Sequence, residues 1–459
     1  MATTVKTTGT WRLARVAVLL MVVGTIGAGC GGSAGKGGAT HHGGAINVAI
    51  VDNPQTQDLA RLTPSLFTAG TGIKVNYTIL DEGTLREVTT RDVAERGRAF
   101  DAVMIGPYEA PQFGRDGHIV DLTPRAAADR AYALGDVIPS VRNALSYHGR
   151  LYASPFYGES SFLMYRKDIL RKAGIAMPAH PTWTQVAAIA RRLDTRDRAG
   201  ICLRGKAGWG ELGAPFTTML NTFGGTWWSA NPDGSVGRAM VDRPAFHRTL
   251  QFYADLVRDA GERHAADAAY NQCLAQYRAG KVALWYDATV AASNLEADDS
   301  PVRGKNGYVP APVERTPSSG WLWSWALAIP ASSSRRDLAW KYIAWATGPR
   351  YIREAGPRIP GGWPTVPPGT RRSTYRIPDY RRATVRFARP TLAAIESAPI
   401  GHPGTTPRPG VPGIGYVGIP EYQNVADRCT EQFSGVIRGK LSVDAALANC
   451  QSVASRVGQ

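Results

Sequence analysis

Apolar and polar positions between residues 45 and 106 follow two alternating patterns. The segment 45–54 opens with an apolar run typical of a buried strand, 73–80 alternates as a second strand, and 100–106 is a third apolar run. The intervening segments, 56–72 and 84–97, favour helices. This β-α-β-α-β order predicts a sheet of parallel strands with helices on its faces.

Polar or aromatic residues follow each of these three predicted strands. In such sheets, ligands bind outside the carboxyl ends of the strands. The residues at those ends are Asp52-Asn53, Leu80-Asp81-Glu82 and Gly106-Pro107-Tyr108. The pattern therefore predicts binding groups at this edge, with Asn53 and Glu82 as candidates.

A row of tryptophans marks the segment 319–333, SGWLWSWALAIPASS. Trp321, Trp323 and Trp325 occupy every second position, so in a strand they share one face. We expect Trp321 and Trp323 to form an aromatic platform for a ligand and Trp325 to pack deeper. Core packing of all three rings is the alternative interpretation.

A carboxylate follows another predicted strand. The apolar run 282–286 indicates a buried strand, and Asp287 comes directly after it. A buried carboxylate must be hydrogen-bonded, because an unpaired buried charge is unfavourable. Asp287 could bind a ligand or cap a following helix, and the residues alone leave both open.

Length and composition indicate a folded protein of more than one lobe. The chain has 459 residues, of which 44% are hydrophobic and 20% are charged. Such a chain is too long for a single ordinary core and too apolar for disorder. Two lobes are therefore expected.

The first thirty residues have the features of an export signal. Three basic residues (Lys6, Arg12 and Arg15) precede an apolar run at 16–29, which is short for a membrane span and ends at Cys30. The sequence IGAGC (26–30) resembles the lipobox of bacterial lipoproteins, although Gly27 stands where Leu is usual. This resemblance implies a signal peptide at 1–29, lipidation of Cys30 and a flexible tether at 30–44. Secretion with cleavage near an alanine is the alternative.

The net charge is strongly positive without a nucleic-acid motif. Removing residues 1–29 takes away three basic residues and no acidic one, so the formal charge of +16 becomes +13. The arginines are scattered, apart from pairs such as 371–372 and 381–382. We interpret the excess as a solvated basic surface over an anionic membrane or cell wall, with no nucleic-acid partner.

Four cysteines remain besides Cys30, and an even number in an oxidising compartment suggests two disulfides. Three pairings are possible. Cys429 and Cys450 flank a predicted helical hairpin at 425–454 with a turn at Gly439, which favours 429–450 and leaves Cys202 with Cys273. No CxxC or histidine-spaced set suggests zinc or another metal site.

Several segments, in order along the chain, resemble the solute-binding lipoproteins of carbohydrate ABC importers (family 1). Those segments are HGRLYASPFYGESSFLMYRKDILRKAGI (148–175), PTWTQVAAIARRL (181–193), GWGELGAPFTTMLNTFGGTWW (208–228), AGKVALWYDATVAASNLE (279–296), SGWLWSWALAIPASS (319–333) and PPGTRRSTYRIPDYRRA (367–383). The resemblance covers about residues 45–425 and is most similar to the branch associated with sorbitol, mannitol and related polyols or sugars. Gly83 departs from that branch, which often has Asn there.

The resemblance implies an α/β, two-lobe periplasmic-binding-protein-like fold (type II) with the ligand between lobes joined by a multi-crossing hinge. The first lobe would comprise 45–153 and 308–357, and the second 154–307 and 358–459. It implies a monomer, lipid-anchored on the extracytoplasmic face of the cell membrane, that delivers a sugar or polyol to the permease subunits of an ABC importer without a cofactor.

A sugar or polyol needs flat aromatic rings beneath its C–H faces and amide, carboxylate or guanidinium groups around its hydroxyls. The candidate ligand-binding residues are Asn53, Glu82, Tyr157, Glu159, Trp227, Asp287, Trp321, Trp323 and Arg371.

Catalytic motifs are missing from the sequence. It contains no nucleophile-elbow GxSxG between a predicted strand and a predicted helix, and no HExxH or P-loop signature. Glu82 and Glu159 could form the acid/base pair of an exported glycoside hydrolase, since two carboxyls suffice for that chemistry. A cell-wall carbohydrate-binding lipoprotein without a transport role is a third possibility. We expect a binding protein and no enzyme.

Overall fold

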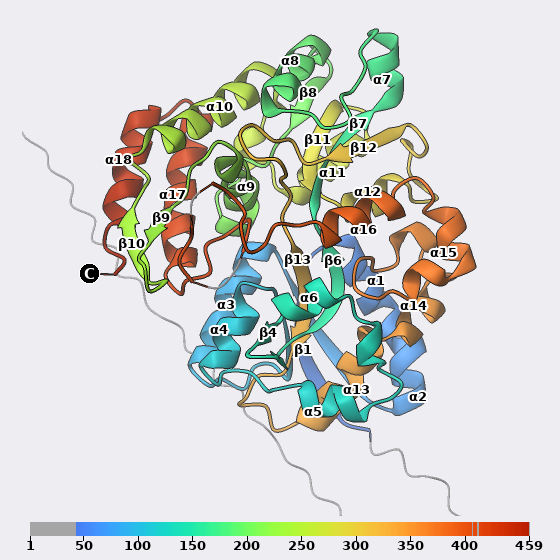
Figure 1. Cartoon of the computed structure of the whole chain (residues 1–459). Coiled ribbons are helices and arrows are strands. Elements are labelled where there is room, and N and C mark those ends of the chain that lie inside the picture. Colours follow the sequence, from blue (N-terminus) through green and yellow to red (C-terminus); the bar gives the residue numbers. More distant parts are fainter. Residues whose placement is uncertain (1–42, 406, 411–412, 459) are drawn as a thin grey trace, which may run out of the picture. The chain divides into compact units, whose positions relative to one another are not determined.

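The computed structural model describes residues 43–405, 407–410 and 413–458 (Figure 1). The predicted signal peptide, Cys30 and the tether up to residue 42 lie outside the described residues. The first large sheet has the order β2-β1-β3-β13-β6, with β1 (Ala45–Val51), β2 (Lys74–Leu80), β3 (Ala102–Ile105), β13 (Trp323–Ala328) and β6 (Ser154–Glu159). The second has the order β12-β7-β11-β8, with β12 (Asn306–Pro310), β7 (Ser161–Arg166), β11 (Val282–Ala288) and β8 (Ala199–Cys202).

Strand direction gathers the ends of the first sheet at one edge. Strand β1 is parallel to β2 and β3, whereas β13 is antiparallel to both β3 and β6. The carboxyl ends of β1, β2, β3 and β6 therefore lie at the same edge as the start of β13. The predicted strand-end groups and the tryptophan row consequently meet there.

The second sheet repeats this arrangement. Strands β8 and β11 are parallel, and β7 is antiparallel to β11 and β12. Only Ser160 separates β6 of the first sheet from β7 of the second. The edge that holds the carboxyl ends in one sheet is thus joined directly to the corresponding edge in the other.

Each sheet is the centre of one lobe, and the chain passes between the sheets at Ser160 and again between β12 and β13. β6 belongs to the first sheet and β12 to the second, each next to a predicted crossing. The lobe boundaries expected at residues 153, 307 and 357 stay a prediction.

Two of the helices before the first crossing begin at capping side chains, Asn53 and Asp81. Asn53 caps α1 by accepting a hydrogen bond from the backbone of Thr56, and Pro54 takes the first helical position. These helices are α1 (Pro54–Thr63), α2 (Ala69–Thr71), α3 (Glu82–Ala94), α4 (Glu109–Arg115), α5 (Thr123–Ala128) and α6 (Pro139–Ala144). The predicted helix 56–72 is thus split by a π-helical segment, η1 (Pro64–Thr68).

The helices between the two crossings pack on the second sheet or on one another. Thr182 and Gln185 form a capping box at the start of α8. These helices are α7 (Lys167–Lys172), α8 (Trp183–Leu193), the π-helical η3 (Trp209–Gly213), α9 (Ala214–Thr222), α10 (Pro244–Ala260), α11 (Tyr270–Arg278) and α12 (Ala291–Leu295). Two small antiparallel pairs are β4 (Ser146–Tyr147) with β5 (Arg150–Leu151), and β9 (Trp228–Ala230) with β10 (Val236–Ala239).

The C-terminal part of the chain is helical, and Figure 1 shows α17 and α18 side by side next to α10. These last helices are α13 (Arg336–Ala346), α14 (Pro349–Ala355), α15 (Pro378–Ala383), α16 (Ala388–Glu396), α17 (Tyr422–Ile437) and α18 (Val443–Ala454). Gly439 has a φ of 70° in the turn between α17 and α18, as the predicted hairpin requires.

Both disulfides expected from the sequence are present. Cys429 joins Cys450 across the α17–α18 hairpin, and Cys202 at the end of β8 joins Cys273 in α11. The Cys202–Cys273 bond holds α11 beside the edge of the second sheet at which the ligand cavity lies.

None of the helices in the described part of the chain has the length and apolarity that a membrane span requires. Within the same residues, no group of three His, Cys, Asp or Glu side chains could hold a metal ion.

Candidate ligand site between the two sheets

A cavity of about 240 Å³ lies where the two sheet edges meet. This volume is below the roughly 300–1,000 Å³ typical of sites for drug-sized ligands, so it suits a small solute. Six of the nine predicted ligand-binding residues line it: Asn53, Glu82, Tyr157, Glu159, Trp321 and Trp323.

The register of β6 against β13 explains how three of these residues meet. Glu159 pairs with Trp323, and Tyr157 pairs with Trp325. Directly paired residues in an antiparallel ladder project from the same face of the sheet. The amide of Asn53, at the end of β1, donates a hydrogen bond of 3.0 Å to the hydroxyl of Tyr157. One edge of the first sheet therefore presents both amide and carboxyl groups beside indole rings.

Trp321, Trp323 and Trp325 line the cavity, but their rings are not stacked face to face. Trp323 lies nearly perpendicular to Trp325, with ring centres 5.6 Å apart. Trp325 also lines the cavity, although we expected it only to pack. Gly106 permits this arrangement, because a Cβ there would lie 1.9 Å from the ring of Trp323.

A guanidinium group covers part of the aromatic surface. Arg86 in α3 lies over the rings of Trp209, Trp323 and Trp325, at 4.0, 4.7 and 4.8 Å from their centres. Cation–π attraction of this kind contributes about 0.5–2 kcal/mol, more when the cation is desolvated. Arg86 also forms ion pairs with Glu82 and with the buried Glu109. The aromatic surface that remains for a ligand is therefore centred on Trp321 and the uncovered parts of the other rings.

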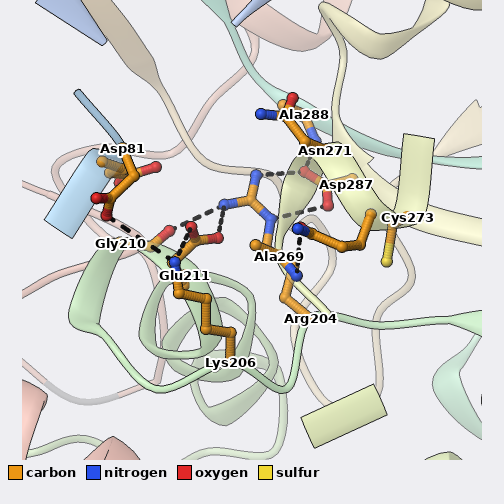
Figure 2. Close-up of polar contacts among 12 residues, drawn as sticks. Asp81, Arg204, Lys206, Gly210, Glu211, Ala269, Asn271, Cys273, Asp287 and Ala288 are labelled. Atoms are coloured by element: carbon orange, nitrogen blue, oxygen red, sulfur yellow. Dashed lines mark hydrogen bonds and ion pairs between the residues drawn. The ribbon is translucent and has the colours of Figure 1, made fainter. Parts of the chain in front are cut away.

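The second sheet contributes a buried ion pair. Arg204, just after β8, donates hydrogen bonds of 2.9 and 2.6 Å to the two carboxylate oxygens of Asp287, near the end of β11 (Figure 2). Asp287 also accepts from the indole of Trp285 and from the backbone of Ala288, and it is fully buried. Asp287 therefore lies behind Arg204, and only Arg204 faces the cavity.

Asp287 does not cap the helix that follows it, which was one of its two predicted roles. Helix α12 begins at Ala291 and its N-cap residue is Val290. Asp287 instead holds the position of Arg204, whose third nitrogen donates a 3.0 Å hydrogen bond to the carbonyl of Gly210.

Glu211 links Arg204 to a further cation of the site, Lys206. Its carboxylate lies 3.4 Å from Arg204 and 4.0 Å from the ammonium of Lys206, which in turn lies 3.9 Å from Asp81 (Figure 2). Burial raises the pKa of Glu211 to about 7, although Arg204 opposes this. Charged groups from both lobes thus surround the mouth of the cavity.

Glu159 has the most unusual environment of the lining carboxyls. Only 6% of its surface is exposed. Burial, together with the nearby carboxylates of Asp287 and Glu82, raises its pKa to about 8, although Arg204 and a hydrogen bond with Trp321 oppose the rise. A carboxyl with this pKa serves hydroxyl groups either as acceptor or, when protonated, as donor.

Two other predicted site residues lie away from the cavity. Trp227 is fully buried, packs edge-on against Phe246 at 5.1 Å and donates its indole hydrogen bond to Thr217. It is a core residue of the second lobe, because its ring also packs against Phe216 and Phe433.

Arg371 is also fully buried. It donates hydrogen bonds of 2.7 and 2.8 Å to the carbonyls of Thr347 and Tyr132, and its guanidinium lies 4.6 Å from the ring centre of Tyr132. Arg371 was predicted to bind the ligand, but it is instead an internal brace between the segments of Tyr132 and Thr347.

Sequence reasoning missed several lining residues: Arg86, Arg204, Lys206, Trp209, Glu211, Tyr270 and Asn271. Arg204 had the same signal as Asn53, since it follows a strand, but the strand 199–202 was not predicted. Arg86 lies four positions after Glu82, the spacing of a helical ion pair.

Comparison with known proteins agrees with this geometry. Residues 50–352 match the family described as "Bacterial extracellular solute-binding protein". The chain belongs to that family. Its relatives include the mannitol-binding protein of Pseudomonas aeruginosa, which is 39% identical over 417 residues, covering 90% of this chain and 92% of that protein.

Solved structures of ABC transporter solute-binding proteins have the same architecture. One from Agrobacterium vitis, with bound D-mannitol, is 40% identical, has a TM-score of 0.85 and aligns over 90% of this chain and 97% of that chain. Another from Agrobacterium radiobacter, in complex with ribitol, is 25% identical, has a TM-score of 0.77 and aligns over 90% and 98% of the two chains. The predicted two-lobe periplasmic-binding-protein fold is confirmed.

This solute-binding protein is not an enzyme, as expected from its sequence. Glu82 and Glu159 are also unsuited to act as the acid/base pair of a glycoside hydrolase, because Glu82 forms an ion pair with Arg86 at 2.8 Å. What the site can do is offer hydrogen bonds and ring faces to a small solute.

Proposed function

We propose that this protein captures a hexitol-like polyol, with D-mannitol as the first candidate, and delivers it to the permease of an ABC importer. The observation that carries the proposal is the small cavity that Asn53, Glu159, Arg204 and Trp321 line together. A polyol presents hydroxyls that need paired donors and acceptors, and C–H faces that pack on an indole. A relative named for mannitol and solved relatives with bound D-mannitol or ribitol support this ligand class.

The two-lobe architecture supports a capture mechanism. Lining residues come from both sheets, so a bound polyol contacts both lobes at once. The lobes are proposed to follow the predicted division (45–153 with 308–357, and 154–307 with 358–459), with β6 assigned to the first lobe and β12 to the second because of the sheets to which they belong. The assembly with the permease is proposed from the family, and the protein is proposed to act as a monomer.

Thermal shift tests the ligand class directly. A ligand that binds only the folded state raises the melting temperature by mass action. We expect D-mannitol and related hexitols to stabilise the protein, with smaller shifts from pentitols and disaccharides. Stabilisation by peptides or phosphoesters, with none by any polyol or sugar, would contradict the proposal.

The lipid anchor at Cys30 is part of the same proposal, because a tethered receptor stays close to its permease. Cys30→Ala should move the protein from the membrane to the soluble fraction without changing its melting temperature. If the variant stays with the membrane, the segment 16–29 is an uncleaved anchor.

A further inference from the structure

Positive charge is concentrated between residues 371 and 396. This segment includes α15 and α16 and contains seven arginines but only two acidic residues, Asp379 and Glu396. Its net charge of +5 is more than a third of the +13 of the chain from residue 30. Arg371 is buried, whereas the other six arginines are exposed. The segment therefore presents a basic surface that takes no part in lining the ligand cavity.

Most of these exposed arginines have no acidic partner within the described part of the chain. Arg382 pairs with Asp379, and Arg386 lies 3.7 Å from the buried Glu296. No described carboxylate lies within ion-pair distance of the other four, which are Arg372, Arg376, Arg381 and Arg389. Their guanidinium groups are therefore available to anions outside the chain, and phosphate is an anion that a guanidinium binds through two hydrogen bonds.

The same segment contains the most exposed large hydrophobic side chain of the described residues. Val385 is 72% exposed, compared with 40% for Ile79, the next among them. Val385 lies in the turn between α15 and α16 (Figure 1) and lines an open groove together with Pro378, Arg381, Ala388, Arg389 and Leu392. An exposed apolar side chain among basic ones fits the boundary of an anionic bilayer, where phosphates lie next to acyl chains.

We propose that the turn between α15 and α16 binds the surface of an anionic membrane. Val385 enters the headgroup layer, and Arg381, Arg389 and the neighbouring arginines pair with lipid phosphates. Contact at this turn orients the protein on the bilayer, which a tether alone does not do. The inference goes beyond polyol capture, and it depends on the proposed function only through the anchor at Cys30.

The length of chain before the described residues favours a membrane as the partner. Gly43, the first described residue, is thirteen residues after Cys30. A chain of this length spans at most about 45 Å. A lipid at Cys30 therefore keeps the folded part within this distance of the bilayer and raises its local concentration there. Attraction between the arginines and the lipids acts over about 8 Å at physiological salt, so the basic surface samples that range repeatedly.

Vesicle sedimentation tests this contact with the Cys30→Ala protein, in which no attached lipid contributes. The vesicles contain either phosphatidylcholine alone or phosphatidylcholine with one third phosphatidylglycerol. We expect binding to the anionic vesicles to be at least tenfold tighter than to the neutral ones and to weaken as salt is added. Equal binding to both, or binding to neither, would overturn the inference. Calorimetry with D-mannitol on the same protein tests the proposed function separately, so the two can fail independently.

Matched variants assign the binding to this turn. Arg381→Gln/Arg389→Gln should weaken binding to the anionic vesicles at least tenfold without changing the affinity for D-mannitol. Arg192→Gln/Arg248→Gln removes the same charge from two exposed arginines in α8 and α10, which also have no ion-pair partner among the described residues. This control should bind the vesicles as the parent protein does. An equal loss in the two double variants would show that net charge alone decides binding and would overturn the assignment.

Val385 distinguishes a lipid partner from a soluble polyanion. Val385→Ser should weaken binding to the anionic vesicles several-fold and leave binding to heparin, a soluble anionic polymer, unchanged. Unchanged vesicle binding in this variant, together with tighter binding to heparin than to vesicles, would assign the basic surface to a soluble polyanion and overturn the membrane contact.

Discussion

The guanidinium of Arg86 lies 4.0 Å from the ring centre of Trp209, and these two residues come from different lobes. Arg86 belongs to α3, which packs on the first sheet, and Trp209 belongs to η3, which follows strand β8 of the second sheet. Other contacts across the cleft support this one, since Tyr108 donates a 3.0 Å hydrogen bond to the carbonyl of Ile419 and Asn271 donates to that of Asp52. The lobes are therefore held together by specific contacts on both sides of the cavity.

Gly210 limits how closely these lobes approach. A Cβ at this position would lie 1.8 Å from the carboxylate of Glu82. We expect Gly210→Ala to weaken polyol binding at least tenfold with a smaller effect on melting, because the clash arises only when the lobes are together. Gly70→Ala is the control, since a Cβ at Gly70 meets nothing within 4 Å. Equal affinities for wild type and Gly210→Ala by calorimetry would contradict this view of closure.

The Arg204–Asp287 pair should be far more important for stability than a surface ion pair. Removing one partner of a buried pair leaves an uncompensated charge, which typically reduces stability by about 3–5 kcal/mol. We predict a loss of this size for Asp287→Ala in urea unfolding. The double variant Arg204→Met/Asp287→Leu should regain much of it, because no unpaired charge remains. A single variant as stable as wild type would show that Glu211 alone can satisfy Arg204.

The pH dependence of stability follows from the two carboxyls with raised pKa. Glu159 and Glu211 have pKa values of about 8 and about 7 in the fold against an ordinary value of 4.5, so between these values the folded protein binds more protons than the unfolded chain. Stability without ligand should therefore be retained near pH 5 and fall as the pH rises to about 8. Melting scans across this range check the sign. Glu159→Gln should flatten the slope, whereas a melting temperature that rises from pH 5 to pH 8 in both proteins would contradict the assignment.

The strand-end groups were predictable because strand direction decides where they go. Asn53 and Glu82 follow strands and Glu159 ends one, all indicated by the apolar pattern or the family resemblance, and the sheet places all three at one edge. The disulfide of the C-terminal hairpin was predictable for a similar reason, since a short helical hairpin leaves its cysteines little choice of partner.

The environment of each side chain could not be predicted from the sequence. Trp227 and Arg371 had plausible neighbours along the chain, but their burial depends on segments far away, such as those of Phe246 and Tyr132. Arg86 over the tryptophans is likewise a tertiary contact between lobes. Local pattern therefore located the edge of the site, and long-range packing decided which residues reach it.

Trp321 provides the aromatic part of the site, and a matched tryptophan controls for folding. Loss of its ring face should weaken binding by about 1–3 kcal/mol, or roughly ten- to a hundredfold in affinity. We predict this for Trp321→Leu. Trp345→Leu should lower the melting temperature without weakening binding, because Trp345 is comparably buried but packs on Phe67 and Tyr351 outside the cavity lining. If Trp321→Leu binds like wild type yet melts early, its ring is only a core element.

Titration of the purified wild-type protein with D-mannitol tests the central claim most directly. The account predicts saturable binding of one D-mannitol per chain in isothermal titration calorimetry, with quenching or shift of tryptophan fluorescence over the same concentration range. Absence of both signals up to millimolar D-mannitol and other hexitols, from a protein that melts cooperatively, would contradict it.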